Sequence, residues 1–163
     1  MEYLIKRDKH RSCHSFKLFY DCKRMTKLVT FTDSCIYKFG DVDDLDINKL
    51  FGFSFGYHQT DSVRFGWHPT TYNKIEIFAY IYSNTKRIIQ SIGEIDLNKE
   101  YKFEILLYND SMYQFIILEN ERILFDKIVN RGETKHKIGY QLYPYFGGNR
   151  TAPHDIKIIL KET

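Results

Sequence analysis

Hydrophobic and polar residues alternate along almost the whole of this chain. A period of two is typical of strands that bury one face, and no segment carries the apolar stripe of an amphipathic helix. The segment 43–50 is predicted to form one helical turn at most. We predict eleven strands, near residues 14–20, 27–39, 51–57, 62–68, 74–83, 86–95, 101–108, 111–119, 122–129, 136–146 and 154–161.

Short gaps rich in turn-forming residues, such as Asn109-Asp110 and Arg131-Gly132, separate these strands. Short strands at this spacing are typical of an all-β sandwich or barrel. The three strands between residues 101 and 129 form a meander that resembles the back half of concanavalin A-like jelly rolls. We therefore predict an antiparallel β-sandwich in a single domain, residues 1–163. Residues 1–50 contribute N-terminal strands and an acidic loop, and residues 51–161 the sandwich with the candidate site.

Two distant stretches combine glycine, aromatic rings, histidine and arginine: residues 51–69 and residues 143–155. Strand alternation places Trp67 on the core face and Arg64 on the opposite face. The predicted core consists of Phe53, Phe55, Val63, Phe65, Trp67, Ile75, Ile77, Ile81, Ile105, Leu107, Phe115, Ile117, Ile138, Tyr140, Leu142, Ile156 and Ile158.

The residues that point away from this core, with one glycine-rich loop, form the candidate ligand-binding site. Glycines within residues 51–66 indicate a bulge, tight sheet packing or close approach of a ligand. His154 fits two interpretations, a hydrogen-bonded histidine at the edge of the core or a site residue. The candidate ligand-binding residues are His58, Arg64, His68, Glu76, Tyr80, Gln141, Tyr143, Tyr145, Asn149, Arg150 and His154.

The formal net charge is +3. This charge is too mild to favour long nucleic acid as a partner, and it favours a neutral or anionic ligand. No apolar run approaches the ~20 residues of a membrane helix, so we expect no membrane association. Three cysteines without a CxxC motif or an apolar leader predict free thiols and a cytoplasmic location, that of a bacterial host if the gene is phage-borne.

No metal or cofactor is expected. The acidic run 41–48 fails as an EF-hand, because Lys49 stands where glycine is needed and Phe55 where a bidentate glutamate is needed. His10, Cys13 and His14 are three potential zinc ligands, but no second cluster completes a four-ligand site.

The sequences FGFSFGYH…SVRFGWHP and PYFGGNRTAPHDIKI resemble those of small uncharacterised bacterial and phage-borne proteins. The resemblance covers residues 51–161. It implies a concanavalin A-like β-sandwich and no assigned chemistry, so no catalytic residue follows from it. Glu76 stands alone between two isoleucines, which argues against a glycosidase that uses two carboxylates.

The residues favour a non-enzymatic binding protein for a small polar or anionic ligand of nucleotide type, for example one that sequesters a host nucleotide signal for a phage. Arg64, Arg150 and the histidines would hold phosphate or carboxylate, and tyrosines would stack on a ring. Three alternatives stay open. They are a carbohydrate-binding lectin-like module, a glycan lyase or phosphodiesterase that uses His58, His68 or His154 as acid and base, and a structural protein that assembles. A homo-oligomer is compatible with each.

Overall fold

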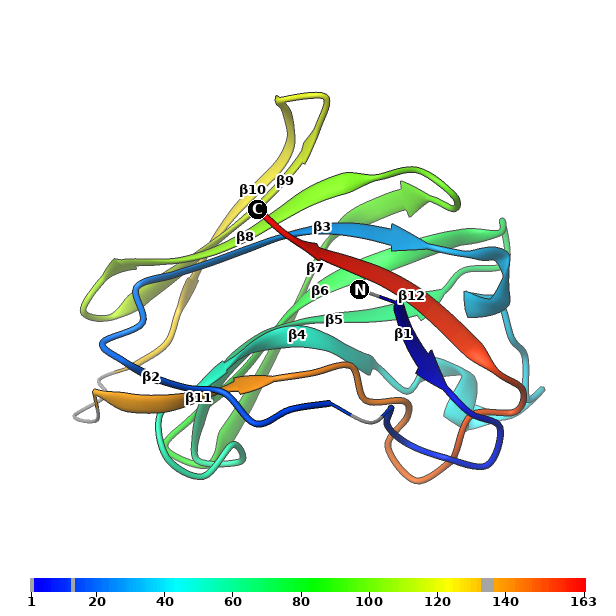
Figure 1. Cartoon of the computed structure of the whole chain (residues 1–163), viewed down its shortest axis with the longest axis horizontal. Coiled ribbons are helices and arrows are strands. Elements are labelled where there is room, and N and C mark those ends of the chain that lie inside the picture. Colours follow the sequence, from blue (N-terminus) through cyan, green and yellow to red (C-terminus); the bar gives the residue numbers. More distant parts are fainter. Residues whose placement is uncertain (1, 13, 133–136) are drawn as a thin grey trace.

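Two six-stranded antiparallel sheets pack face to face in the computed structural model, which describes residues 2–12, 14–132 and 137–163 (Figure 1). The prediction of an all-β antiparallel sandwich is confirmed. Near the two ends of the chain, successive strands belong to different sheets. In between, β4–β7 form a meander within one sheet and β8–β10 a meander within the other.

The first sheet, sheet A, has the order β1-β12-β3-β8-β9-β10. Its strands are β1 (Glu2–Ile5), β3 (Arg24–Phe31), β8 (Tyr101–Asn109), β9 (Met112–Glu119), β10 (Arg122–Asn130) and β12 (Ile156–Glu162). The second sheet, sheet B, has the order β2-β11-β4-β5-β6-β7. Its strands are β2 (Leu18–Tyr20), β4 (Asn48–Ser54), β5 (Asp61–Pro69), β6 (Lys74–Ser83), β7 (Lys86–Asp96) and β11 (Ile138–Leu142).

The described residues contain twelve strands where the hydrophobic pattern predicts eleven. The additional strand, β1, has only four residues, which is too short for a clear alternation. The strand predicted over 27–39 ends at Phe31, because the 3₁₀ turn η1 (Asp33–Cys35) follows it. The acidic segment forms a second 3₁₀ turn, η2 (Val42–Leu45), and the Asp41 carboxylate caps it by accepting from the Asp43 N–H at 3.0 Å.

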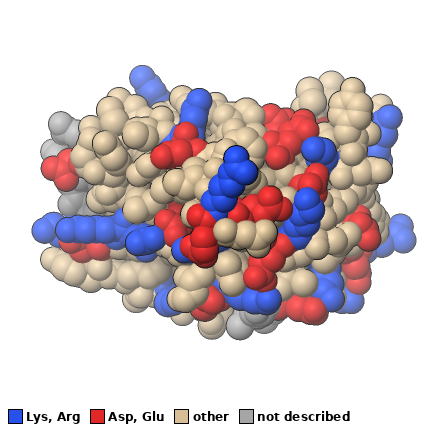
Figure 2. All heavy atoms as spheres, turned by 90° about the horizontal axis from the view of Figure 1, so that it is seen from above, with Lys and Arg blue, Asp and Glu red and all other residues tan. Residues whose placement is uncertain are grey.

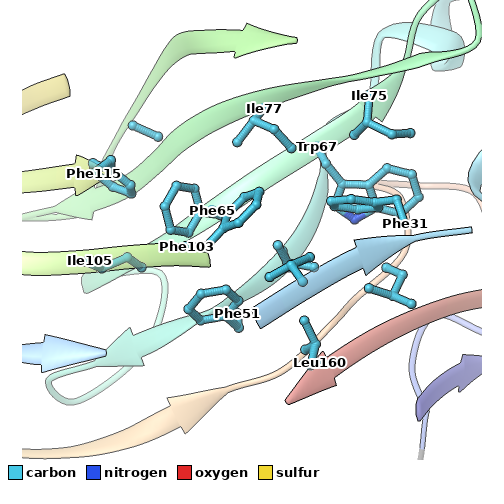
Figure 3. Packing of buried hydrophobic residues seen from close by; sticks show 14 of the residues in the cluster. Phe31, Phe51, Phe65, Trp67, Ile75, Ile77, Phe103, Ile105, Phe115 and Leu160 are labelled. Carbon is cyan, nitrogen blue, oxygen red and sulfur yellow. The ribbon is translucent and has the colours of Figure 1, made fainter. Parts of the chain in front are cut away.

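Large aromatic and branched side chains from both sheets fill the space between them (Figure 3). Phe65 from β5 contacts Phe103 and Phe115 from sheet A edge-on, at ring-centroid distances of 4.8 and 5.0 Å. Trp67 is fully buried against Phe31. Burial of such side chains is the main stabilising contribution to a sandwich fold.

Most of the predicted core is buried, with β11 as the exception. The side chain of Ile138 is 68% exposed, and Tyr140 is only half-buried. Register explains the error, because Tyr140 pairs with Ser54 and Gln141 with Phe53. Cross-strand partners lie on the same face of a sheet, so Gln141 shares the inward face of Phe53 and the predicted phase of this strand is wrong. Leu107 lies half-buried at the margin of the core.

Gly52 is required by the close approach of β5. A Cβ atom at this position would lie 2.0 Å from the Val63 carbonyl oxygen and 2.7 Å from the Arg64 Cβ. The register of β4 against β5 also shifts between Lys49 and Gly52. Of the three explanations for the glycines, tight packing and a bulge therefore apply at Gly52.

Charges of both signs are interspersed on the face that lies uppermost in Figure 1 (Figure 2). Lys and Arg side chains stand next to Asp and Glu over this whole view, as the mild net charge of +3 leads one to expect. No helix in the described part of the chain is long and apolar enough to span a membrane.

Candidate functional site

The outer face of sheet B carries a continuous row of side chains across four strands. Leu142 pairs with Gly52, Gly52 pairs with Arg64, and Arg64 pairs with Tyr80. Direct cross-strand partners project to the same side of a sheet, so these residues line up on one surface. The next row consists of Tyr140, Ser54, Ser62, Tyr82 and Arg87.

A cavity of about 310 Å³ opens over these rows. This volume is at the lower end of the range for small-molecule sites. Four basic side chains contribute to the wall, and none of the described lining residues is Asp or Glu. The lining residues are Lys49, His58, Gln59, Arg64, Tyr80, Tyr82, Arg87, Tyr145, Gly147, Gly148 and Asn149.

Arg64 forms the floor of this cavity. Its side chain is buried, with 7% of the residue exposed, and its Nε atom has no hydrogen-bond partner among the described residues. The guanidinium lies over the Tyr80 ring, 5.4 Å from the centroid. Burial lowers the pKa of Arg64 from its ordinary value. A buried charge without a compensating anion is costly, so the site is suited to a ligand that supplies the anion.

Lys49 lies beside Arg64 in the same wall. Its Nζ donates to the Gly147 carbonyl at 2.9 Å and lies 5.3 and 5.8 Å from the ring centroids of Tyr80 and Tyr145. Burial and the positive charge of Arg64 lower the pKa of Lys49 to about 8, against a smaller opposing effect of Asp46. A substantial fraction of this amine is therefore neutral near physiological pH.

His58, Tyr80 and Arg87 of the wall each have a polar partner. His58 Nδ1 lies 3.3 Å from the Tyr140 hydroxyl, and burial with the charge of Arg64 lowers the pKa of His58 below its ordinary value. Burial raises the pKa of Tyr80. A hydrogen bond with Tyr80 raises the pKa of Arg87, because it favours the charged guanidinium.

A second cavity of about 310 Å³ adjoins the first, and His58, Arg64 and Tyr145 line both. It extends over β11 towards the N-terminal segment. The His14 ring stacks on Tyr143 at 3.9 Å, and the His10 ring stacks on Tyr145 at 5.0 Å. The lining residues are Arg11, His14, Phe16, His58, Arg64, Tyr140, Gln141, Leu142, Tyr143, Pro144 and Tyr145.

Seven of the eleven sequence-predicted site residues border these two cavities. Gln141 borders the second cavity although it shares the inward face of Phe53, and it is buried. Tyr143 also packs towards the core, against Tyr3, and burial raises the pKa of its hydroxyl. The seven residues are His58, Arg64, Tyr80, Gln141, Tyr143, Tyr145 and Asn149.

Four predicted site residues lie elsewhere. His68 and Glu76 share the outer face of sheet B but bond to each other, with His68 Nε2 at 3.1 Å from the Glu76 carboxylate. Ser91 donates a second hydrogen bond to Glu76 at 2.6 Å. His154 Nε2 donates to the Ser34 carbonyl at 2.8 Å, but this histidine is exposed rather than at the edge of the core.

Arg150 braces the loop that frames the first cavity. Its guanidinium forms ion pairs with Asp41 and Asp43 and lies over the Phe39 ring, 5.1 Å from the centroid. Gly147, Gly148 and Asn149 of the same loop line the cavity, but Arg150 does not. The acidic run of the sequence therefore anchors this loop.

Sequence reasoning missed Lys49, Tyr82, Arg87, Arg11 and His14 as cavity residues. The sequence carried a signal for Arg87, because Asn84 is a turn-forming residue that tolerates the positive φ found at Asn84 and Thr85. Such a two-residue hairpin sets Tyr82 directly opposite Arg87. The N-terminal contribution had no comparable signal, since Arg11 reaches Tyr145 through an isolated bridge between distant segments.

Within the described ranges, no group of three His, Cys, Asp or Glu side chains is arranged to hold a metal ion. Cys13, one of the three potential zinc ligands in the sequence, lies outside these ranges. His10 and His14 instead stack on tyrosines of the second cavity.

Comparison with solved structures finds similar folds among proteins of low sequence identity. A variant of alginate lyase Aly36B in complex with alginate trisaccharide aligns with a TM-score of 0.61 at 18% identity, over 99% of this chain and 78% of that one. Alginate lyase vAL-1 from Chlorella virus aligns with a TM-score of 0.62 at 9% identity, over 99% and 81%. A functionally unknown Saccharomyces cerevisiae protein aligns with a TM-score of 0.56 at 7% identity, over 99% and 88%.

No family model and no curated protein matches the sequence. The β-sandwich implied by the resemblance of residues 51–161 is therefore supported by the fold, while its sequence motifs stay an expectation. The prediction of a nucleotide-binding protein is corrected, because the similar folds include those of two glycan lyases and nothing supports a nucleotide ligand.

Proposed function

We propose that this protein is a polysaccharide lyase that cleaves a uronate-containing glycan by β-elimination. One observation carries the proposal: Arg64 is buried at the floor of the first cavity, and its Nε has no hydrogen-bond partner among the described residues. Lys49 and Arg87 line the same cavity, and none of its described lining residues carries a carboxylate. The likeness of the fold to two alginate lyases supports it.

Elimination from a uronate begins with removal of the proton next to the sugar carboxylate. This proton is weakly acidic, because the carbanion develops beside a group that is already negative. A cation that pairs with the sugar carboxylate stabilises the negative charge that develops on this carboxylate as the proton leaves. Such preorganised electrostatic stabilisation is a large contribution to catalysis. Arg64 is suited to this role, since guanidinium binds carboxylate through parallel hydrogen bonds.

In the proposed reaction, neutral Lys49 accepts the C5 proton of the sugar bound at Arg64. The electron pair of that C–H bond forms the C4=C5 double bond, and the C4–O glycosidic bond breaks. Tyr145 donates a proton to the departing oxygen. The products are an unsaturated uronate at one new end and a hydroxyl at the other, and no water is consumed.

Lys49 fits the role of base because its pKa, about 8, leaves a neutral amine in reach at moderate pH. Tyr145 fits the role of acid because it faces the cavity next to Lys49. The distance from the Lys49 Nζ to the centroid of the Tyr145 ring is 5.8 Å. His58 completes the wall on the other side of Arg64.

The test is incubation of the purified protein with alginate and with polygalacturonate while the ultraviolet absorbance of the unsaturated product is followed. We expect turnover on one of these polymers, and a loss of at least about 100-fold in the variants Lys49→Met and Arg64→Lys. Lys99→Met is the matched control, because Lys99 is an exposed lysine whose partners are Asp96 and Glu119.

Two outcomes contradict the proposal. Chain cleavage without unsaturated product would indicate hydrolysis, and tight glycan binding without cleavage would indicate the lectin-like alternative. Because Arg64 is buried, thermal unfolding of Arg64→Lys must match that of the parent protein before its activity is interpreted.

A further inference from the structure

Arg64 lies where the two cavities meet rather than at the closed end of one. On the side of β6 and β7 the wall is basic, with Arg87 from β7 and Lys49 from β4. On the side of β11 and the N-terminal segment the wall is largely aromatic, with Phe16 and Tyr140 in tilted contact at 5.7 Å between ring centroids. The surface therefore continues in both directions from the proposed reaction centre.

The aromatic side extends beyond the cavity to the edge of sheet B. Leu18 pairs with Tyr140 and Tyr20 pairs with Ile138, so these side chains project from the same outer face as Arg64. Figure 1 shows β2 and β11 side by side at this margin. Phe16, Leu18, Tyr20 and Ile138 are exposed by 69%, 62%, 72% and 68%. So many large apolar groups together on a surface mark a binding site.

We propose that this strip, defined as Phe16, Leu18, Tyr20, Ile138 and Tyr140, is a second arm of the groove that holds sugar residues beyond the cleaved bond. The proposal rests on the proposed lyase function and specifies its substrate, a long uronate chain that crosses Arg64 and is cut internally. A ligand centred on Arg64 meets Tyr140 two strand spacings away, roughly 10 Å.

Two properties of the strip favour a glycan as its occupant. The apolar faces of sugar rings pack on aromatic side chains, and the exposed Tyr20 can offer its hydroxyl to sugar hydroxyl groups. The described lining of the adjoining cavity has no Asp or Glu to repel a polyanion, and Arg11 adds a positive charge there. A chain held at Arg64 by its carboxylate therefore finds a compatible surface on this side.

The test compares a short and a long ligand. Binding of alginate trisaccharide and of alginate polymer is measured by titration calorimetry in the Lys49→Met background, so that cleavage does not consume the ligand. We expect Phe16→Ala and Tyr140→Ala to weaken polymer binding by about 3- to 10-fold and to change trisaccharide binding by less than about 2-fold. Tyr140→Phe keeps the ring and should bind the polymer as the parent does.

Tyr108→Ala is the matched control, because Tyr108 is a 56% exposed tyrosine on β8 of the other sheet. Polymer binding that is unchanged in both Phe16→Ala and Tyr140→Ala overturns the proposal. A parent dimer that Phe16→Ala converts to a monomer, with unchanged polymer binding, also overturns it and assigns the strip to contact between two copies of the chain.

The time course of cleavage separates this inference from the lyase proposal. Internal cutting lowers the viscosity of the polymer early, before much unsaturated product accumulates, whereas release of short products at constant viscosity overturns the second arm. If Phe16→Ala and Tyr140→Ala weaken polymer binding but the parent forms no unsaturated product, the second arm is supported and the lyase proposal is contradicted. Failure of the parent to bind any uronate polymer overturns both.

Discussion

Lys49 and Tyr145 are direct cross-strand neighbours, although 95 positions separate them in the sequence. The Lys49 N–H donates to the Tyr145 carbonyl at 2.8 Å, and the Tyr145 N–H donates to the Lys49 carbonyl at 2.9 Å. Paired backbones project their side chains to the same side, so the amine and the phenol are presented together at the cavity. The proposed base and acid are thus positioned by backbone hydrogen bonds.

The pH dependence of cleavage identifies the base. Lys49 accepts a proton only when neutral, and its pKa is about 8, so kcat/KM should rise as the pH increases through about 8 and level off above it. Burial and the charge of Arg64 lower the pKa of His58 from its usual value of about 6.5, so with His58 as base the rise of kcat/KM would have its midpoint below that pH. A pH profile of kcat/KM distinguishes the two residues.

The ion pairs of Arg150 predict an indirect effect on binding. Since Arg150 holds the cavity loop to Asp41 and Asp43, Arg150→Ala and the double variant Asp41→Asn/Asp43→Asn should raise KM by a similar factor, and combining all three changes should show little further effect. Steady-state kinetics on the polymer that supports turnover give this comparison. A raised KM in Arg150→Ala with an unchanged KM in Asp41→Asn/Asp43→Asn would instead indicate that Arg150 contacts the substrate.

Gly52→Ala should destabilise the fold by about 3 kcal/mol, because the added methyl group meets the backbone of β5 at 2.0 Å and no side-chain motion relieves that contact. Gly66→Ala is a matched control on the same sheet face, where the nearest atom is the Ile47 Cγ2 at 2.5 Å, the end of a side chain. We expect a cost of about 1 kcal/mol there. Urea unfolding of both variants tests the difference, and equal costs would contradict it.

The core substitutions Phe65→Ala and Trp67→Phe should differ strongly. Phe65 is fully buried between both sheets, so its truncation should cost about 3 to 5 kcal/mol. The Trp67 Nε1 has no hydrogen-bond partner in the described part of the structure, so its replacement by phenylalanine forfeits packing alone and should cost about 1 to 2 kcal/mol. Thermal unfolding followed by circular dichroism measures both, and a larger cost for Trp67→Phe would refute this reasoning.

The faces of β5 and β6 could be predicted from the sequence. In β5 and β6 the buried and outward positions alternate as the apolar pattern indicates, which correctly puts Trp67 inside and Arg64 outside. In β11 the same reasoning failed, because only five residues form the strand and its apolar residues do not mark the inward face. Gln141 is buried there while Ile138 is exposed.

Local sequence by itself determined the all-β class, most strand positions and the outward direction of Arg64, because alternation and turn chemistry act between near neighbours in the chain. Only the tertiary structure decided which outward residues meet. Pairing between distant segments brings Lys49 and Arg11 of the N-terminal segment next to Tyr145, while His68 and Glu76 bond to each other on the same face. Sheet order and register depend on long-range pairing and packing, and a periodic pattern along one chain does not specify them.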